Sequence, residues 1–386
     1  MPVMQEILKP SFVTKIVSRI RTPGAVLSNF FGVNIGGRNV EQVKLPTPQY
    51  TYDIFDKTRK VARGRFRGAP AGSIAPNSVG NNTVTIGRFA QKLPMDYTTI
   101  ASIRALGENA GVTDRMGKRY IEKQSEYANQ HHSNLREFVI GSLLRGGVYY
   151  LHASGDDLIP SYTSSGALFT NDLLVPASNE LIAGSFAAGL AMDTGSNTIT
   201  ATWATITNDI PLMLQRVSAG FERQVGEPLR YVVCNHTVWN NVISNTPVRQ
   251  LAGTSSSPWA SWDRDTLKAP DGTPLGVQVA RIKGLDWIGW LITDHGLDIY
   301  DGSSETFTKI VPDDYCLFTT DISDWLMGIE GTEIVKQNDM AAPEEATGMF
   351  GWIMEKADPA RFELHSVQNF ALELNRPKAL AVARVQ

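Results

Sequence analysis

Few residues in this sequence have the types and spacing that catalysis or metal binding requires. His131 and His132 are the one adjacent pair among six histidines. Neighbouring residues on a helix point about 100° apart, so the two rings make a poor pair of ligands for one metal ion. We therefore assign these histidines no ligand and no proton to carry.

Cys234 and His236 could be read as a nucleophile with its base, or as two metal ligands. Cys234 ends an apolar stretch and His236 opens a short helix, so core packing explains the thiol better. Cys316 is the only other cysteine, and two cysteines are too few for a disulfide framework or a four-cysteine metal site. We expect two inert core thiols in a protein matured in a reducing cytosol.

Paired carboxylates occur at Asp313-Asp314 and Glu344-Glu345, each after a proline in turn-like sequence where solvated side chains are expected. The chain has no glycine-rich phosphate loop after a strand, no Gly-x-Ser-x-Gly turn and no His-Glu-x-x-His sequence. The sequence therefore predicts no catalytic residue, no cofactor, no metal site and no enzymatic activity.

The composition is that of a folded protein. With 386 residues, 42% of them hydrophobic, the chain can bury one large core or two modest ones. The N-terminus shows no export signal, and no apolar run approaches the roughly 20 residues of a membrane span. We expect a soluble protein that is made and kept inside a cell.

One segment is strongly basic although the net charge of the chain is only -3. Residues 57–95 contain no Asp or Glu. Extended sequence on both sides of a turn-rich stretch, 68–82, predicts a long β-hairpin over 40–97. The cationic side chains of this segment are Lys57, Arg59, Lys60, Arg63, Arg65, Arg67, Arg88 and Lys92.

Three interpretations of this basic hairpin stay open. A run of charge is often a solvated face. Nucleic-acid binding would require interleaved aromatic residues, and the segment offers only Phe66 and Phe89. Docking on an acidic surface of another subunit is favoured, because an exposed hairpin too thin to bury itself is marginal without a partner.

A long helix is predicted over 113–146, between a Thr113 cap and the Gly146-Gly147 stop. At about 1.5 Å per residue it would be a strut of roughly 50 Å. Its expected apolar stripe consists of Met116, Tyr120, Tyr127, Leu135, Phe138, Val139 and Leu143.

The other segments alternate between helical and extended patterns. Residues 1–22 predict an amphipathic arm, and residues 203–225 a second helix with Pro211 as a kink. A strand follows and leads into a short helix capped by Asn235. Further strands continue to residue 319 and again over 350–385. The expected fold class is α+β.

This order of elements resembles the HK97-type capsid fold and, within it, the lambda-like phage major capsid protein E family. Three stretches add to the resemblance. Arg67-Gly68-Ala69-Pro70-Ala71-Gly72 is similar to the hairpin tip of that family, Val311-Pro312-Asp313-Asp314 to the approach to a late strand, and Asp358-Pro359-Ala360-Arg361 to the C-terminal segment.

The resemblance implies five parts of the chain. They are an N-terminal arm (1–39), an extended loop (40–97), a peripheral domain (98–202) with the spine helix 113–146, an axial α/β domain (203–345), and C-terminal strands (346–386) that return to the peripheral domain.

The implied function is that of the major capsid protein of a tailed double-stranded DNA bacteriophage, forming hexamers and pentamers of an icosahedral head. The implied partners are other copies, a separate scaffolding protein, a portal, a decoration protein, and packaged DNA held without sequence specificity. The resemblance also implies that the protein is located in the virion, and in the host cytoplasm during assembly. Some relatives join subunits through Lys-Asn isopeptide bonds, for which Lys57, Lys60 and Lys92 are candidates by location. An encapsulin-type compartment shell and a soluble β-rich enzyme remain the alternatives.

Overall fold

The computed structural model describes most of the chain. The described residues are 25–34, 37–44, 48–54, 80–96, 115–145, 147–152, 158–162, 167–176, 179–182, 202–268, 274–300, 305–321, 325–335, 344–357 and 360–385. The predicted arm over 1–22, the hairpin tip and the Thr113 cap lie outside them.

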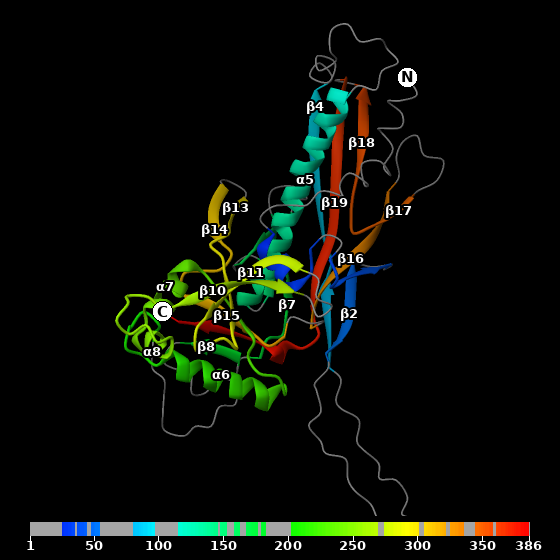
Figure 1. Ribbon diagram of the computed structural model, residues 1–386. Coiled ribbons are helices and arrows are strands. Elements are labelled where there is room, and N and C mark those ends of the chain that lie inside the picture. Colours follow the sequence, from blue (N-terminus) through cyan, green and yellow to red (C-terminus); the bar gives the residue numbers. More distant parts are fainter. Residues whose placement is uncertain are drawn as a thin grey trace, which may run out of the picture.

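The longest strands form a six-stranded sheet in this part of the chain (Figure 1). Its centre is β19, fifteen residues long, which pairs with β18 along one edge and with β4 and then β16 along the other. Short strands β1 and β17 complete it through β16. The strands are β1 (Val40–Val43), β4 (Gly87–Asp96), β16 (Leu326–Val335), β17 (Glu344–Thr347), β18 (Met349–Ala357) and β19 (Ala360–Leu374).

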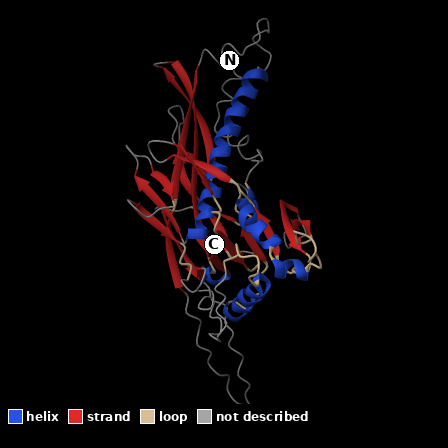
Figure 2. Ribbon diagram, turned by 90° about the vertical axis from the view of Figure 1, so that its left-hand side faces the viewer, coloured by secondary structure: helices blue, strands red, loops and turns tan. Residues whose placement is uncertain are grey.

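A long helix lies along this sheet. Helix α5 (Arg115–Gly141) continues into a 3-10 turn, η1 (Ser142–Arg145), so the predicted long helix is confirmed over its described length. Figure 2 shows α5 running beside the long strands as one layer of an elongated two-layer body. At 27 residues the helix is about 40 Å long.

A second, seven-stranded sheet has the order β10-β11-β12-β9-β15-β20-β8 among the described strands. Its central pair, β9 and β12, is parallel. The strands are β8 (Glu180–Ile182), β9 (Tyr231–Cys234), β10 (Trp262–Lys268), β11 (Pro274–Ile282), β12 (Gly289–Ile292), β15 (Tyr315–Thr319) and β20 (Leu380–Arg384). The helices of this part are α6 (Ile210–Gln224), α7 (His236–Ser244) and α8 (Thr246–Leu251).

The other described strands form three small sheets. Strands β2 (Gln49–Ile54) and β3 (Gly80–Thr85) form the base of the predicted hairpin, with Ile54 opposite Gly80 where the chain leaves and re-enters the pair. The other two sheets are β6-β5-β7, from Leu158–Ser161, Gly147–His152 and Ala167–Asp172, and β13-β14, from Gly296–Tyr300 and Glu305–Lys309.

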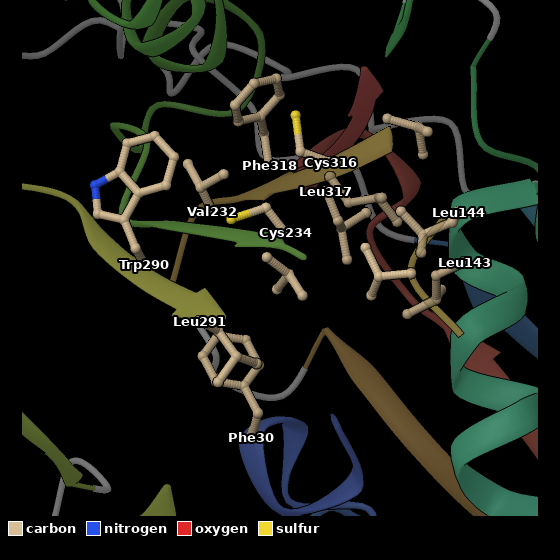
Figure 3. Close-up of a cluster of buried hydrophobic side chains, with 14 of the residues drawn as sticks. Phe30, Leu143, Leu144, Val232, Cys234, Trp290, Leu291, Cys316, Leu317 and Phe318 are labelled. Atoms are coloured by element: carbon tan, nitrogen blue, oxygen red, sulfur yellow. The ribbon is translucent and has the colours of Figure 1, made fainter. Parts of the chain in front are cut away.

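One hydrophobic core joins the two large sheets. Figure 3 shows side chains of β9, β12 and β15 packed together, with Leu143 and Leu144 from η1 and Phe30 from helix α3 (Val26–Phe31) closing around them. Phe30 and Phe31 are fully buried and meet Tyr231 and Trp325 edge to face. Leu27, Phe30, Phe31 and Val33 of the expected arm are therefore part of the core.

The α+β class and the order of hairpin, long helix, α/β sheet and returning strands are confirmed. Each large sheet takes strands from more than one of the expected ranges, however. β16 belongs to the six-stranded sheet, while β8 and β20 belong to the seven-stranded one. The five-part division itself stays a prediction.

Two local predictions in the α/β part had different outcomes. Asn235 caps α7, because its side chain accepts from the Val238 N–H at 2.9 Å. The kink at Pro211 was wrong. α6 begins at Ile210, capped by Asp209, so the proline occupies the first turn, where a missing N–H costs nothing.

A proline within α5 tests whether continuity of this helix matters. Ser133 is buried in the middle of α5. Ser133→Pro removes a helical hydrogen bond and clashes with the preceding turn, so the free energy of unfolding should fall by about 3 kcal/mol or more. Ser133→Ala keeps the helical backbone and is the control. Denaturant unfolding of the unassembled protein measures both, and equal stabilities would show that α5 is not a rigid element.

Candidate subunit-contact surface and the buried polar seam

The structure describes only two of the eight cations assigned to subunit contacts. Lys57, Arg59, Lys60, Arg63, Arg65 and Arg67 lie outside the described residues. Arg88 and Lys92 are exposed on β4. The Nε atom of Arg88 donates to both carboxylate oxygens of Glu333 on β16, at 3.0 and 2.9 Å. Arg88 thus has an acidic partner in its own chain, and Lys92 stands opposite His365 in the sheet.

The cysteines are core residues, as predicted. Cys234 on β9 and Cys316 on β15 are fully buried in adjacent strands (Figure 3). Burial raises the pKa of both thiols above their usual range, so neither is a thiolate at neutral pH. His236 is exposed and its Nδ1 lies 2.7 Å from a carboxylate oxygen of Asp294. The histidine therefore orients toward an acid on the surface and not toward the thiol.

Three of the four paired carboxylates, Asp313, Asp314 and Glu345, bind other side chains of this chain in addition to being solvated. Asp313 accepts from Asn235, Thr237 and Lys309, which joins the start of α7 to the turn before β15. The hydrogen bond from Lys309 holds the pKa of Asp313 below its usual range. Asp314 pairs with Arg384 of β20 at 3.0 Å, and Glu345 pairs with Lys44.

The face of α5 that meets the six-stranded sheet is polar along half of its length. We call this row the polar seam; its buried members are Ser125, Asn129, His132, Ser133 and Arg136. The predicted apolar stripe holds from Leu135 onward: Leu135 is half-buried and packs against the core, and Phe138, Val139 and Leu143 are buried. Tyr127, predicted to be buried, is 54% exposed, and its ring lies tilted by 56° against the exposed ring of His131. The side chains of Met116 and Tyr120 lie outside the described part of the helix.

The two histidines have different environments. His132 is fully buried, and its Nε2 lies 2.8 Å from the hydroxyl oxygen of Ser366 on β19. Burial, helped by the nearby charge of Arg136, lowers the pKa of His132 to about 3. The ring is therefore neutral at pH 7 and acts as a packing residue.

Arg136 and Glu137 tie three distant segments together at the lower end of the seam. Arg136 forms a buried ion pair with Glu330 of β16, donates to the Val33 carbonyl at 3.1 Å, and lies over the Phe370 ring. A buried guanidinium is tolerable only with such partners.

Glu137 caps α3 from outside that helix. Its carboxylate accepts from the Leu27 N–H at 3.0 Å and from the Ser28 N–H at 2.7 Å, two donors that a helix start leaves unpaired. Burial raises the pKa of Glu137 to about 7, although the hydrogen bonds from Ser28 and Leu27 oppose the shift by favouring the ionised form.

An acidic and aromatic cluster on the opposite face of the sheet was missed by the sequence analysis. Tyr50 and Tyr52 of β2 stack with ring centroids 6.4 Å apart, and the buried Glu373 of β19 lies beside them. The alternation of the tyrosines along a strand does place them on one face. The carboxylate comes from more than 300 residues later, as Glu373, and no local pattern signals that contact.

Two further searches of the described residues bear on function. No group of three His, Cys, Asp or Glu side chains there could hold a metal ion. Among the described helices, none combines the length and apolar character that crossing a bilayer requires.

Comparison with known proteins finds similarity only at the level of structure. No protein-family model matches the sequence, and no curated protein matches it. A phage-related protein from Bordetella bronchiseptica RB50 is 8% identical, with 97% of this chain and 96% of that chain covered and a TM-score of 0.48. The capsid of Ralstonia phage GP4 is 9% identical, with coverages of 95% and 93% and a TM-score of 0.47. The SrpI encapsulin of Synechococcus elongatus PCC 7942 is 11% identical, with coverages of 89% and 83% and a TM-score of 0.39. Similarity of this size does not by itself assign a function.

The seam predicts that the adjacent histidines differ in their effect on stability. His132→Ala leaves a cavity and deprives the Ser366 hydroxyl of its partner, so the free energy of unfolding should fall by about 1–3 kcal/mol. His131→Ala removes an exposed ring and should change it by less than about 0.5 kcal/mol. Denaturant titration at pH 7 measures the free energy of unfolding of both variants. An equal loss in the two would contradict the assignment of His132 as a buried packing residue.

Glu137 predicts a specific dependence of stability on pH. Its pKa is about 7 when folded and 4.5 ordinarily, so between these values the folded state binds a proton that the unfolded state has released. This stabilisation is fully present below pH 4.5 and is lost as pH rises through 7, by up to about 3 kcal/mol. Glu137→Gln should flatten the curve of unfolding free energy against pH over this interval. Glu126→Gln, at an exposed position of the same helix, should leave the curve unchanged, and identical curves for wild type and Glu137→Gln would refute the assignment.

Proposed function

We propose that this chain is the major capsid protein of a tailed double-stranded DNA bacteriophage, which assembles with many copies of itself into an icosahedral head of hexamers and pentamers. One observation carries the proposal. The helix α5 and the six-stranded sheet form a long, thin body attached at one end to the core of the seven-stranded sheet (Figure 1). A two-layer body of this kind offers broad faces to neighbouring copies.

The course of the chain supports the same function. β1 and β4 come from the N-terminal quarter, yet they pair with β16 and β19 from the C-terminal quarter. The hairpin base β2-β3 packs on this sheet through Tyr52, Val84 and Ile86 against Ala371 and Ile329. The basic segment thus starts from a firmly anchored pair of strands, as a loop reaching toward another subunit would require.

The finer assignment follows the resemblance in the sequence. We place the chain with the lambda-like major capsid protein E family, with the five-part domain division given above. Its partners would be a separate scaffolding protein, a portal, a decoration protein and the packaged DNA. It would be located in the virion, and in the host cytoplasm during assembly. Lys57, Arg59, Lys60, Arg63, Arg65, Arg67, Arg88 and Lys92 would form the subunit-contact set.

Electron microscopy of the purified protein separates the alternatives. Closed shells exclude a soluble enzyme, and shells that enclose genomic DNA in virions exclude an encapsulin-type compartment. A protein that stays monomeric at high concentration would contradict the proposal.

Charge reversal in the basic segment tests how subunits join. Arg63→Glu, Arg65→Glu and Arg67→Glu together should give a folded protein that forms no shells at physiological salt, because like charges at a contact repel where opposite charges set the register. Reversal of three exposed cations near the seven-stranded sheet, Arg230, Lys268 and Lys283, is the matched control. Shells of normal size from the first variant would refute a contact role for these arginines.

A further inference from the structure

Exposed apolar side chains gather at one end of the seven-stranded part. Among the described residues seven large hydrophobic side chains are exposed, and four of them lie on α8, on α6 or on the loops beside these helices. We call these four, Ile206, Leu212, Leu251 and Trp259, the α8 surface. Helix α8 lies at the end of this part that is remote from α5 and the six-stranded sheet (Figure 1). Single exposed apolar residues are ordinary, but a group of them marks a candidate binding surface.

Hydrogen bonds and helix contacts hold the α8 surface in place. The Ile206 carbonyl accepts from the Thr246 N–H at the start of α8, at 2.8 Å. Leu212 lies in the first turn of α6, a helix that contacts α8. The Trp259 N–H donates to the hydroxyl oxygen of Ser257 at 3.3 Å. A partner would therefore meet a surface that is already arranged, which lowers the entropic cost of binding.

The segments that form this surface carry almost no charge. Residues 202–208 and 250–262 contain no Asp, Glu, Lys or Arg, although these residue types make up 19% of the chain. Arg249, the one charged residue of α8, is half-buried and donates to the Ser257 carbonyl at 2.6 Å and to the Thr246 hydroxyl oxygen at 3.2 Å. The centres of protein interfaces are depleted in charged residues and enriched in aromatic ones. The α8 surface has this composition.

The lack of charge favours one kind of partner, a second copy of this chain. DNA and anionic lipid would both require cations, which residues 202–208 and 250–262 do not supply. Where identical chains are related by a rotation, equivalent residues near the axis approach one another, so a charge there meets its own sign. Apolar residues avoid this repulsion, and burying them is favourable. An uncharged surface is therefore complementary to itself.

We infer that the α8 surfaces of neighbouring copies meet one another in the assembled shell, with Trp259 and Leu251 at the centre of the contact. The inference rests on the proposed function, since it requires assembled copies. Trp259 is 52% and Leu251 is 50% exposed in the single chain, so both have apolar area left to bury. Tryptophan is the residue type that most often dominates the free energy of such contacts. This contact is apolar, whereas the one proposed for the basic segment depends on charge.

Opposite charges introduced at one position test whether equivalent surfaces meet. Trp259→Asp and Trp259→Lys should each raise the protein concentration needed for particle formation at least tenfold, which corresponds to about 1.4 kcal/mol per subunit. The reason is that each variant sets like charges against each other. Mixed in equal amounts before assembly, the two variants should form particles again, because the introduced carboxylates then face the introduced ammonium groups. Sedimentation and electron microscopy measure the assembled fraction.

Three results would overturn the inference. If both variants assemble like wild type, the α8 surface is not buried between copies. If each variant fails and their mixture fails too, the surface packs against a different part of the neighbouring copy. If wild-type protein sediments with phosphatidylcholine vesicles and Trp259→Asp does not, the surface binds a lipid bilayer instead.

Matched changes at another exposed aromatic residue are the control. Phe307 of β14 is 61% exposed, and Phe307→Asp and Phe307→Lys should assemble like wild type; a loss equal to that of the Trp259 variants would refute a specific role of the α8 surface. Leu251→Asp is a second, independent change that should impair assembly as Trp259→Asp does. The unassembled variants should unfold at the same denaturant concentration as wild type, because both side chains are exposed. If wild-type protein forms no shells at all, the proposed function fails; wild-type shells with inert Trp259 and Leu251 variants refute this inference alone.

Discussion

The arrangement of this chain depends on the buried contacts that Arg136 and Glu137 make with segments far away in the sequence. These adjacent residues of α5 reach in two directions, Arg136 to Glu330 of β16 and Glu137 to the first turn of α3. Breaking a buried ion pair by removing one partner costs about 3–5 kcal/mol. A shift of α5 along the sheet would incur this cost, so the ion pair between Arg136 and Glu330 fixes the register of the helix on the sheet. Because Glu137 holds the first turn of α3, the same register also fixes the position of α3 in the shared core.

Along α5 the packing changes in kind. Beyond Phe138 the helix and η1 insert apolar side chains into the core that joins the two sheets, whereas the stretch before it meets the sheet through the polar seam. Apolar packing is strong and tolerates small displacements, while hydrogen bonds such as that of His132 with Ser366 are weaker in net free energy but directional. The C-terminal end of α5 therefore supplies most of the free energy that holds the helix to the core, and the polar seam sets the alignment of the helix on the six-stranded sheet.

The sequence predicted those features that depend on local pattern. The length of α5, the Asn235 cap and the burial of Cys234 and Cys316 follow from periodicity, capping chemistry and apolar context. It did not predict the burial of His132 or the exposure of Tyr127, because a polar helix face buried against a sheet inverts the usual pattern. The Glu373 cluster, the external cap of α3 and the sheet assignment of β16 and β20 depend on contacts between distant parts of the chain, which no spacing along the sequence records.

The order of strands in the seven-stranded sheet has a consequence for biosynthesis. In the described sheet β8 is held only by β20, with Glu180 paired to Val382, and β20 itself sits between β15 and β8. A chain emerging from the ribosome has therefore made β8 long before its partner exists, and such non-local pairing is slow to form. Until β20 is inserted, the edge of β15 stays open as a template for incorrect strand addition. A nascent chain would thus need either rapid completion or chaperone protection of that edge, and a chain that stops before β20 would retain an unfinished sheet that quality-control proteases can recognise.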